Sequence, residues 1–152
     1  MYKSIIILIL ILLDLFSKRI VFNFIDLNNS IYLNPFFDLI HIHNFGVSFG
    51  LFSNIFPSWF LIFIGLFIIA FIIFLLISSQ NLWERRGYSC ILAGAFGNVF
   101  DRMINGYVID FIYFHYYDFY WPAFNFADIY ISVGVLIIVL QIFNDLRKRG
   151  NT

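Results

Sequence analysis

The chain has 152 residues, of which 62% are hydrophobic, 22% are aromatic and only 12% are charged. Because a soluble domain usually carries about 25% charged residues, this composition excludes an ordinary soluble domain and indicates an integral membrane protein. The formal net charge of zero argues against a nucleic-acid partner, and the single cysteine, Cys90, excludes an internal disulfide. The length fits one domain over residues 1–152.

Four apolar segments are long enough to cross a bilayer, which takes ~20 residues in a helix. They cover residues 4–24, 57–78, 88–109 and 126–143. The first begins like a signal peptide, but no small-residue cleavage site follows it, so we expect an uncleaved membrane helix. The second has no charge and is the predicted packing helix, whereas the other three hold ionisable residues and are the predicted functional helices.

The distribution of Lys and Arg predicts how these helices cross the membrane. Six of the nine basic residues would lie on one side of a four-helix arrangement, namely Lys3, Arg85, Arg86, Arg147, Lys148 and Arg149. Since basic residues favour the cytoplasmic side, we expect both termini in the cytoplasm. The connections 23–56 and 110–125 would then lie outside.

The two outer connections differ in composition. The first contains apolar residues near 31–33 and the alternating stretch LIHIHN at 39–44, which predict short strands around a turn at Asn34-Pro35 and before the turn NFGVSFG at 44–50. The second, YFHYYDFYWPAF, is dense in aromatic residues, and we expect it at headgroup level. The predicted fold is therefore an all-α membrane protein with four transmembrane helices and a small extracytoplasmic β-sheet between the first and second helices.

Two aspartates, Asp110 and Asp128, are predicted at the same membrane depth. Asp110 follows a helix that runs outward, and Asp128 lies in the first turn of a helix that runs inward. Two adjacent carboxylates cannot both ionise easily, so they can share a proton. One would act as general base on a water while the other protonates a scissile carbonyl oxygen. Spacing alone also allows two interfacial aspartates, one of them favoured by the helix dipole.

Further ionisable side chains lie within the predicted helices. Asn98, Asp101 and Arg102 are three and four residues apart on one helix. The arginine could bind a carbonyl or phosphate oxygen, or it could form an ion pair that only stabilises packing. Asp14 and Lys18 are four residues apart with the acid first, an order that favours a structural ion pair.

The polar residues of the connections also have two interpretations. Asn44 and Gly46 lie in a turn that could bracket a peptide or headgroup, or could be an ordinary loop. Asn125 precedes the fourth helix, either as a cap or as a substrate-facing amide. His41 and His43 would share a strand face, but a zinc site needs three or four ligands. Since the sequence has no HExxH motif and no cysteine partner for them, we predict no metal site.

Five short motifs make the chain resemble lipoprotein signal peptidase, the type II signal peptidase of bacteria. In chain order they are DLFSK at 14–18, NFGVSF at 44–49, GAFGNVFDR at 94–102, GYVIDF at 106–111 and FNFAD at 124–128. Each motif alone is weak, but the five in order cover nearly the whole chain. The family usually has a second glycine where Ala93 stands here, and because alanine is small we expect close helix packing to remain possible.

The resemblance implies an aspartic endopeptidase that removes the signal peptide from diacylglyceryl-modified prolipoproteins by cutting before the lipidated cysteine. By motif, Asp110 and Asp128 would be its catalytic pair. Substrate-binding residues would be Asn44, Gly46, Asn98, Arg102 and Asn125, with structural polar support from Asp14, Lys18 and Asp101. We expect no cofactor and a monomer surrounded by membrane lipid. It would lie in the bacterial cytoplasmic (inner) membrane with the active site near the extracytoplasmic face.

A second interpretation comes from another class of protein, a small proton-coupled transporter or channel subunit. Asp14, Asp101 and Lys18 would form its proton relay. Such a protein would show inverted repeats or broken helices, and we find neither in the sequence. A third interpretation is a non-catalytic scaffold. A protease would gather its carboxylates near one surface, whereas a transporter would spread polar groups along a path across the bilayer.

Overall fold

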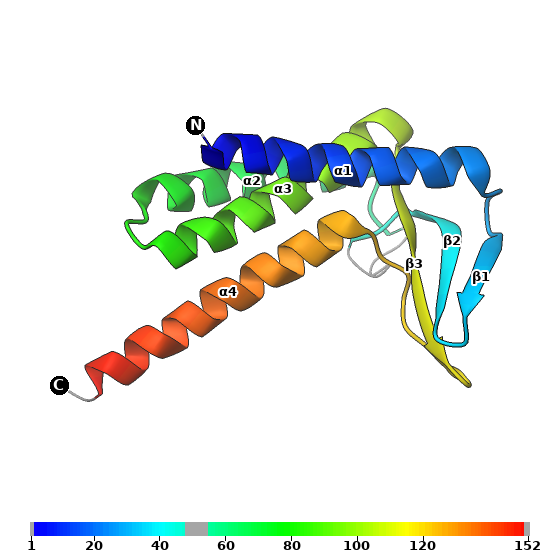
Figure 1. Ribbon diagram of the computed structural model, residues 1–152. Helices are drawn as coiled ribbons and strands as arrows, with labels where there is room; N and C mark the ends of the chain where they lie inside the picture. Colours follow the sequence, from blue (N-terminus) through cyan, green and yellow to red (C-terminus); the bar gives the residue numbers. More distant parts are fainter. Residues whose placement is uncertain (1, 48–54, 151–152) are drawn as a thin grey trace.

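The computed structural model describes residues 2–47 and 55–150, which form four helices and four strands. In chain order these are α1 (Tyr2–Phe24), β1 (Ser30–Asn34), β2 (Phe37–Asn44), α2 (Ser58–Ser78), α3 (Leu82–Asn105), β3 (Val108–Tyr116), β4 (Phe119–Tyr120) and α4 (Phe126–Arg149). Both ends of the chain lie at one end of the helices, and the sheet lies at the other end (Figure 1). Each of the four segments predicted to be helical contains a helix, and the first connection contains short strands as predicted.

Helix α3 is the central helix and packs against α1, α2 and α4. It approaches α4 closely because small residues lie where the two helices cross. A Cβ atom on Gly94 would overlap the carbonyl oxygen of Ala127, and one on Gly134 would lie 2.6 Å from the carbonyl oxygen of Gly87. Membrane helices commonly use small residues for such contacts. Ala93 is fully buried in this region, which agrees with the expectation that its small side chain allows close helix packing.

The third helix ends earlier than its predicted bounds of 88–109. It stops at Asn105 because Gly106 adopts a left-handed conformation (φ 82°) and donates its backbone N–H to the Arg102 carbonyl. The β-branched residues Val108 and Ile109 then begin β3, as such residues favour strands. Asp110, which was predicted directly after the third helix, therefore lies within a strand that begins three residues beyond the end of α3.

The sheet takes strands from both connections, which corrects the prediction of a sheet confined to the first. Its strands are antiparallel in the order β1-β2-β3-β4. In the β2–β3 pair, Ile42 lies opposite Asp110 and Asn44 lies opposite Val108. The sequence VIDFIYFHY did not predict β3 because five consecutive residues at its start are buried. A strand buried in this way lacks the apolar–polar alternation that marks a half-exposed strand.

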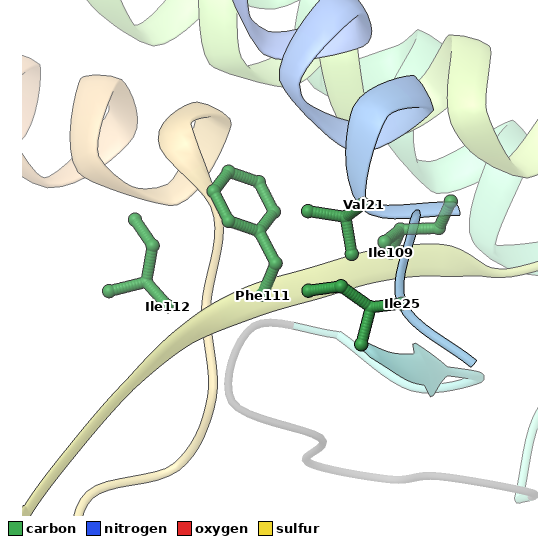
Figure 2. Close-up of a cluster of buried hydrophobic side chains, with 5 residues drawn as sticks. All are labelled: Val21, Ile25, Ile109, Phe111 and Ile112. Carbon is green, nitrogen blue, oxygen red and sulfur yellow. The ribbon is translucent and has the colours of Figure 1, made fainter. Parts of the chain in front are cut away.

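A small apolar core fixes the sheet to the helices. It consists of Val21 and Ile25, at and just beyond the end of α1, and Ile109, Phe111 and Ile112 of β3 (Figure 2). Each of these side chains is at most 7% exposed, and burying one contributes roughly 1.5–3 kcal/mol. Asp110 lies between two of these core residues in the strand, so its backbone is held firmly.

The outer faces of the helices are strongly apolar. On α2, for example, Phe63, Phe67 and Phe74 are 67%, 75% and 63% exposed. Among the described residues, two helices are long and apolar enough to cross a membrane, Ser58–Ser78 and Phe126–Lys148. An exposed apolar surface of this extent marks contact with a membrane or a partner protein.

Candidate active site

Asp110 is a buried carboxylate held by two amides. Its Oδ1 accepts a hydrogen bond from Asn125 Nδ2 at 2.6 Å, and its Oδ2 accepts one from Asn44 Nδ2 at 2.9 Å. Asn44 reaches Asp110 because β2 ends beside the start of β3. Asn44 is itself oriented by the backbone N–H of Gly46, which donates to its Oδ1 at 2.8 Å. The Asp110 carboxylate is therefore fixed from both sides and is only 2% exposed.

Asp128 lies in the first turn of α4, where Asn125 is the N-cap residue. The two residues form a capping box. The Asp128 backbone N–H donates to Asn125 Oδ1 at 3.1 Å, and the Asn125 backbone N–H donates to Asp128 Oδ2 at 3.3 Å. The second oxygen, Oδ1, accepts a hydrogen bond from Asn98 Nδ2 at 3.0 Å. Local helix capping thus determines where this carboxylate lies.

Asn125 joins the two carboxylates. It is fully buried and donates to Asp110 through its side chain and to Asp128 through its backbone. Burial, followed by the negative charge of Asp128, raises the pKa of Asp110 from 3.8 to about 7, against the lowering effect of its two amide hydrogen bonds. A group with this pKa can hold or release a proton near neutral pH, as general acid–base chemistry requires.

Arg102 lies beside the carboxylates without forming an ion pair with them in the described part of the chain. Its Nη2 donates to the Gly46 carbonyl, and its Nη1 donates to the Asn98 carbonyl at 3.4 Å. The guanidinium still interacts favourably with the charges of Asp128 and Asp110. It therefore supplies positive charge next to the pair while keeping donors in a fixed geometry.

A second group of charges, around Lys18, is joined to the carboxylates by hydrogen bonds. Lys18, which is 1% exposed, places its Nζ 2.9 Å from Asp14 Oδ2, 3.5 Å from Asp101 Oδ2 and 3.0 Å from Asn98 Oδ1. Asp14 Oδ1 accepts the backbone N–H of Ala127 at 2.8 Å. Asn98 therefore connects this charged group to Asp128, and Asp14 connects it to the first turn of α4.

The sequence profile of the Signal peptidase (SPase) II family matches residues 6–144. The chain belongs to the signal peptidase II family. The lipoprotein signal peptidase of Thermodesulfovibrio yellowstonii is 40% identical to it over 149 residues, which is 97% of each chain. The lipoprotein signal peptidase of Wigglesworthia glossinidia brevipalpis is 39% identical over 140 residues, which is 90% of this chain and 91% of that one.

Solved structures share the fold of this signal peptidase II chain. A bacterial membrane enzyme determined by the in meso method at 2.3 Å resolution matches it with a TM-score of 0.86 and 28% identity, over 95% of this chain and 89% of that chain. A second such structure, at 1.9 Å resolution, matches with a TM-score of 0.82. The arrangement of helices and sheet is therefore one that occurs in a bacterial membrane enzyme.

In this signal peptidase II chain, hydrogen bonds and ion pairs join all ten predicted site residues into one cluster. The ten are Asp14, Lys18, Asn44, Gly46, Asn98, Asp101, Arg102, Asp110, Asn125 and Asp128. Residues 48–50 of the predicted turn lie outside the described residues.

Sequence reasoning missed other groups in the cluster. Asn105 Nδ2 donates to Asp101 Oδ1 at 2.6 Å, a contact that the spacing of four residues on one helix could have indicated. The backbone N–H groups of Ile109 and Ala127, which donate to Asp101 and Asp14, carry no sequence signal at all.

The two strand histidines form a pair beside the site. His43 Nε2 lies 3.1 Å from His41 Nε2, and His41 Nδ1 lies 2.7 Å from the Ile25 carbonyl oxygen. His43 also stacks on Tyr107, with ring centroids 3.6 Å apart. Within residues 2–47 and 55–150, no group of three or more His, Cys, Asp or Glu side chains is arranged to hold a metal ion.

A cavity of about 250 Å³ borders one carboxylate of the pair. It is lined by Trp121, Phe124, Asp128, Ile129, Ser132 and Val133. Its lining is mostly apolar, so it offers room for a hydrophobic ligand group next to Asp128.

Proposed function

We propose that this chain is a membrane aspartic endopeptidase that removes the signal peptide from diacylglyceryl-modified prolipoproteins by cutting before the lipidated cysteine. The observation that carries the proposal is the pair of buried carboxylates, Asp110 and Asp128, held together by Asn125. Membership of the signal peptidase II family and relatives named lipoprotein signal peptidase support this substrate class.

In the proposed reaction the carboxylate pair holds one proton. The ionised carboxylate takes a proton from a water, whose oxygen attacks the carbonyl carbon of the scissile peptide bond, while the protonated carboxyl donates its proton to the carbonyl oxygen. The tetrahedral diol then collapses as its C–N bond breaks. One diol hydroxyl returns its proton to the pair, and the new amine takes up the proton that came from the water. The pair ends with one proton, as it began.

The hydrogen bonds of the other cluster residues support a proposed role for each of them. Asn44 and Asn125 orient Asp110, and Asn98 orients Asp128. Together with Arg102 and the carbonyl of Gly46, they form the proposed substrate-binding groups. Arg102 can direct a donor at a substrate carbonyl because its guanidinium is already positioned beside the pair.

Asp14, Lys18 and Asp101 form the proposed structural support. Their contacts are with one another, with Asn98 and with backbone groups. They hold α1 against α3 and the first turn of α4. The proposed substrate does not need to reach them, because Lys18 and Asp14 are at most 1% exposed.

We further propose that all four helices cross a bacterial cytoplasmic (inner) membrane, with both termini in the cytoplasm and the active site near the extracytoplasmic face. Support comes from the apolar outer faces of the helices and from the chain ends lying opposite the sheet (Figure 1). The protein would act as a monomer surrounded by lipid. A signal-peptide helix and the lipid on the cysteine would then hold the scissile bond at the depth of the carboxylates, which is catalysis by positioning.

The clustering of buried charges favours a protease over a proton-coupled transporter. In the described part of the chain, the buried charged residues are Asp14, Lys18, Asp101, Asp110 and Asp128. All of them belong to the one cluster beside the sheet. A transporter would need polar groups along a path across the bilayer.

The test is cleavage of a diacylglyceryl-modified prolipoprotein by the purified protein, beside the unlipidated precursor. We expect cleavage of the lipidated form only, and loss of that cleavage in Asp128→Asn, because an amide cannot act as acid or base. Asp118→Asn is the matched control, since Asp118 is exposed in the turn between β3 and β4. Normal cleavage by folded Asp128→Asn would refute the catalytic pair, and cleavage of both precursors would refute the lipid requirement.

A further inference from the structure

A groove of about 270 Å³ lies between α1 and the beginning of α3. This end of α3 is the one away from the sheet (Figure 1). Its apolar wall includes Ile6 and Leu10 from α1 and Leu82 from α3. Ile6 and Leu82 are 55% and 49% exposed, so the groove opens on the outer surface of the helices. Arg85 and Arg86 of α3 line the same groove.

Neither arginine of the groove is neutralised by an acidic side chain in the part of the chain that the structure describes. Arg85 Nε is buried and donates no hydrogen bond there. The Arg86 guanidinium lies 4.6 Å from the ring centre of Trp83, which holds it in place. Glu84, the acid beside them in sequence, instead accepts a hydrogen bond from Ser79 Oγ at 2.6 Å. The buried Nε–H of Arg85 and the two unneutralised positive charges therefore favour an anionic acceptor from outside the chain.

The position of the groove across the membrane indicates where that acceptor comes from, given the membrane orientation proposed above. Arg85 and Arg102 are 17 positions apart in α3, a rise of about 25 Å along the helix. The hydrocarbon core of a bilayer is about 30 Å thick. With the carboxylate pair near the outer face, Arg85 and Arg86 lie at the level of the inner headgroups.

We propose that this groove binds an anionic phospholipid of the cytoplasmic leaflet. The phosphate would lie on Arg85 and Arg86, and an acyl chain would lie along Ile6, Leu10 and Leu82. A free phosphate ion would satisfy the arginines but would leave the apolar wall uncovered. A lipid satisfies both, because it carries an anionic headgroup and apolar acyl chains in one molecule. Basic pockets between membrane helices on the cytoplasmic side commonly bind such headgroups.

The test is native mass spectrometry of the purified full chain in detergent, titrated with phosphatidylglycerol or with phosphatidylcholine of the same acyl chains. We expect a preference for phosphatidylglycerol of roughly tenfold, because each arginine near a headgroup adds a favourable electrostatic contribution. In the double variant Arg85→Gln/Arg86→Gln this preference should disappear. The matched control, Arg147→Gln/Lys148→Gln, removes two exposed charges elsewhere on the same end and should keep it.

Several outcomes would overturn the lipid site. These are equal binding of the two lipids by the unaltered protein, an unchanged preference in the Arg85/Arg86 variant, or an equal loss in the Arg147/Lys148 control. Displacement of the lipid by millimolar inorganic phosphate would show a free-anion site instead.

If the Arg85/Arg86 variant does not fold, Leu10→Trp keeps both charges, fills the groove and should reduce lipid binding several-fold. Unchanged binding by Leu10→Trp would also refute the proposal. Cleavage of prolipoprotein does not enter these outcomes, so the site and the proposed activity fail separately.

Discussion

Asn125 uses one side chain for two tasks. Its Oδ1 caps α4 by accepting the Asp128 backbone N–H, and its Nδ2 donates to Asp110. The amide can satisfy both contacts in only one orientation, because the cap needs an acceptor and the carboxylate needs a donor. Stability and the proposed catalytic geometry therefore depend on the same residue.

The matched comparison for this residue is Asn81, the N-cap of α3. Asn81 also accepts backbone N–H groups, from Trp83 and Glu84, but it lies far along the chain from the carboxylates. We expect Asn125→Ala and Asn81→Ala each to cost about 1 kcal/mol of stability as lost caps. Only Asn125→Ala should reduce kcat/KM, by roughly 10²-fold, because it also releases Asp110. Melting curves and cleavage rates check this, and equal losses of activity in both variants would contradict the second task.

The raised pKa of Asp110 predicts the pH dependence of cleavage. Because this pKa is about 7, the proton shared by the pair is lost as pH rises through neutrality. We therefore expect log kcat/KM to fall with a slope of −1 above about pH 7. A pH–rate profile measures this, and a rate that stays constant up to alkaline pH would contradict it.

The same shift predicts a change in stability with pH. Between 3.8 and about 7 the folded state keeps the Asp110 proton while the unfolded state has lost it. This group's contribution to stability is therefore present at low pH and is lost as pH rises to about 7, by roughly 4 kcal/mol. Asp110→Asn should flatten this part of the stability–pH curve.

At the scale of elements, α1 is held in place by charge as well as by apolar packing. Lys18 reaches α3 through Asp101 and Asn98, and its partner Asp14 reaches α4 through the Ala127 backbone N–H. These contacts lie next to the apolar core that joins α1 to β3 (Figure 2). Three helices and the sheet therefore meet at the end of α1 beside the proposed active site.

Removing Lys18 should weaken this junction. Lys18→Ala leaves Asp14 and Asp101 without their common positive partner, and breaking a buried pair costs about 3–5 kcal/mol in soluble proteins. We expect a lower melting temperature and less folded protein. The control is Arg19→Ala, which removes a neighbouring exposed charge that contacts Phe22. A Lys18→Ala protein that melts normally but has lost all activity would refute the structural role.

At the scale of the whole molecule, the two ends of the helix bundle differ in chemistry. The sheet lies at one end of the helices and the chain termini lie at the other (Figure 1). The buried charges belong to the cluster beside the sheet, whereas the Arg85–Arg86 groove lies where α3 begins. Apolar side chains cover the helices between them. This polarity suits a protein that faces two different compartments.

Cysteine labelling checks the proposed orientation. In a Cys90→Ala background, Asp118→Cys places a thiol in the exposed β3–β4 turn, and Gln80→Cys places one in the exposed α2–α3 connection. A membrane-impermeant maleimide should label Asp118→Cys in intact cells and Gln80→Cys only after permeabilisation. The opposite pattern would reverse the orientation, and labelling of both in intact cells would refute the four-helix crossing.

Most of the helical architecture could be predicted from sequence, because apolar segments of membrane length are a local property. The prediction was wrong at the end of the third helix and in the strand that follows it. Gly106 ended α3 early, and the buried start of β3 lacked the alternation of an ordinary strand. The second half of the sheet, and with it the placement of Asp110, was therefore missed.

The sequence by itself determined the membrane class, the four helices and the polar motifs that identify the signal peptidase II family, because composition and motif order do not depend on contacts. Only the tertiary structure decided how those motifs meet. Asn125 joins Asp110 to Asp128, and Asp14 meets a backbone N–H group 113 residues away. Such contacts arise from helix crossings and strand register, which place groups together whatever their separation along the chain.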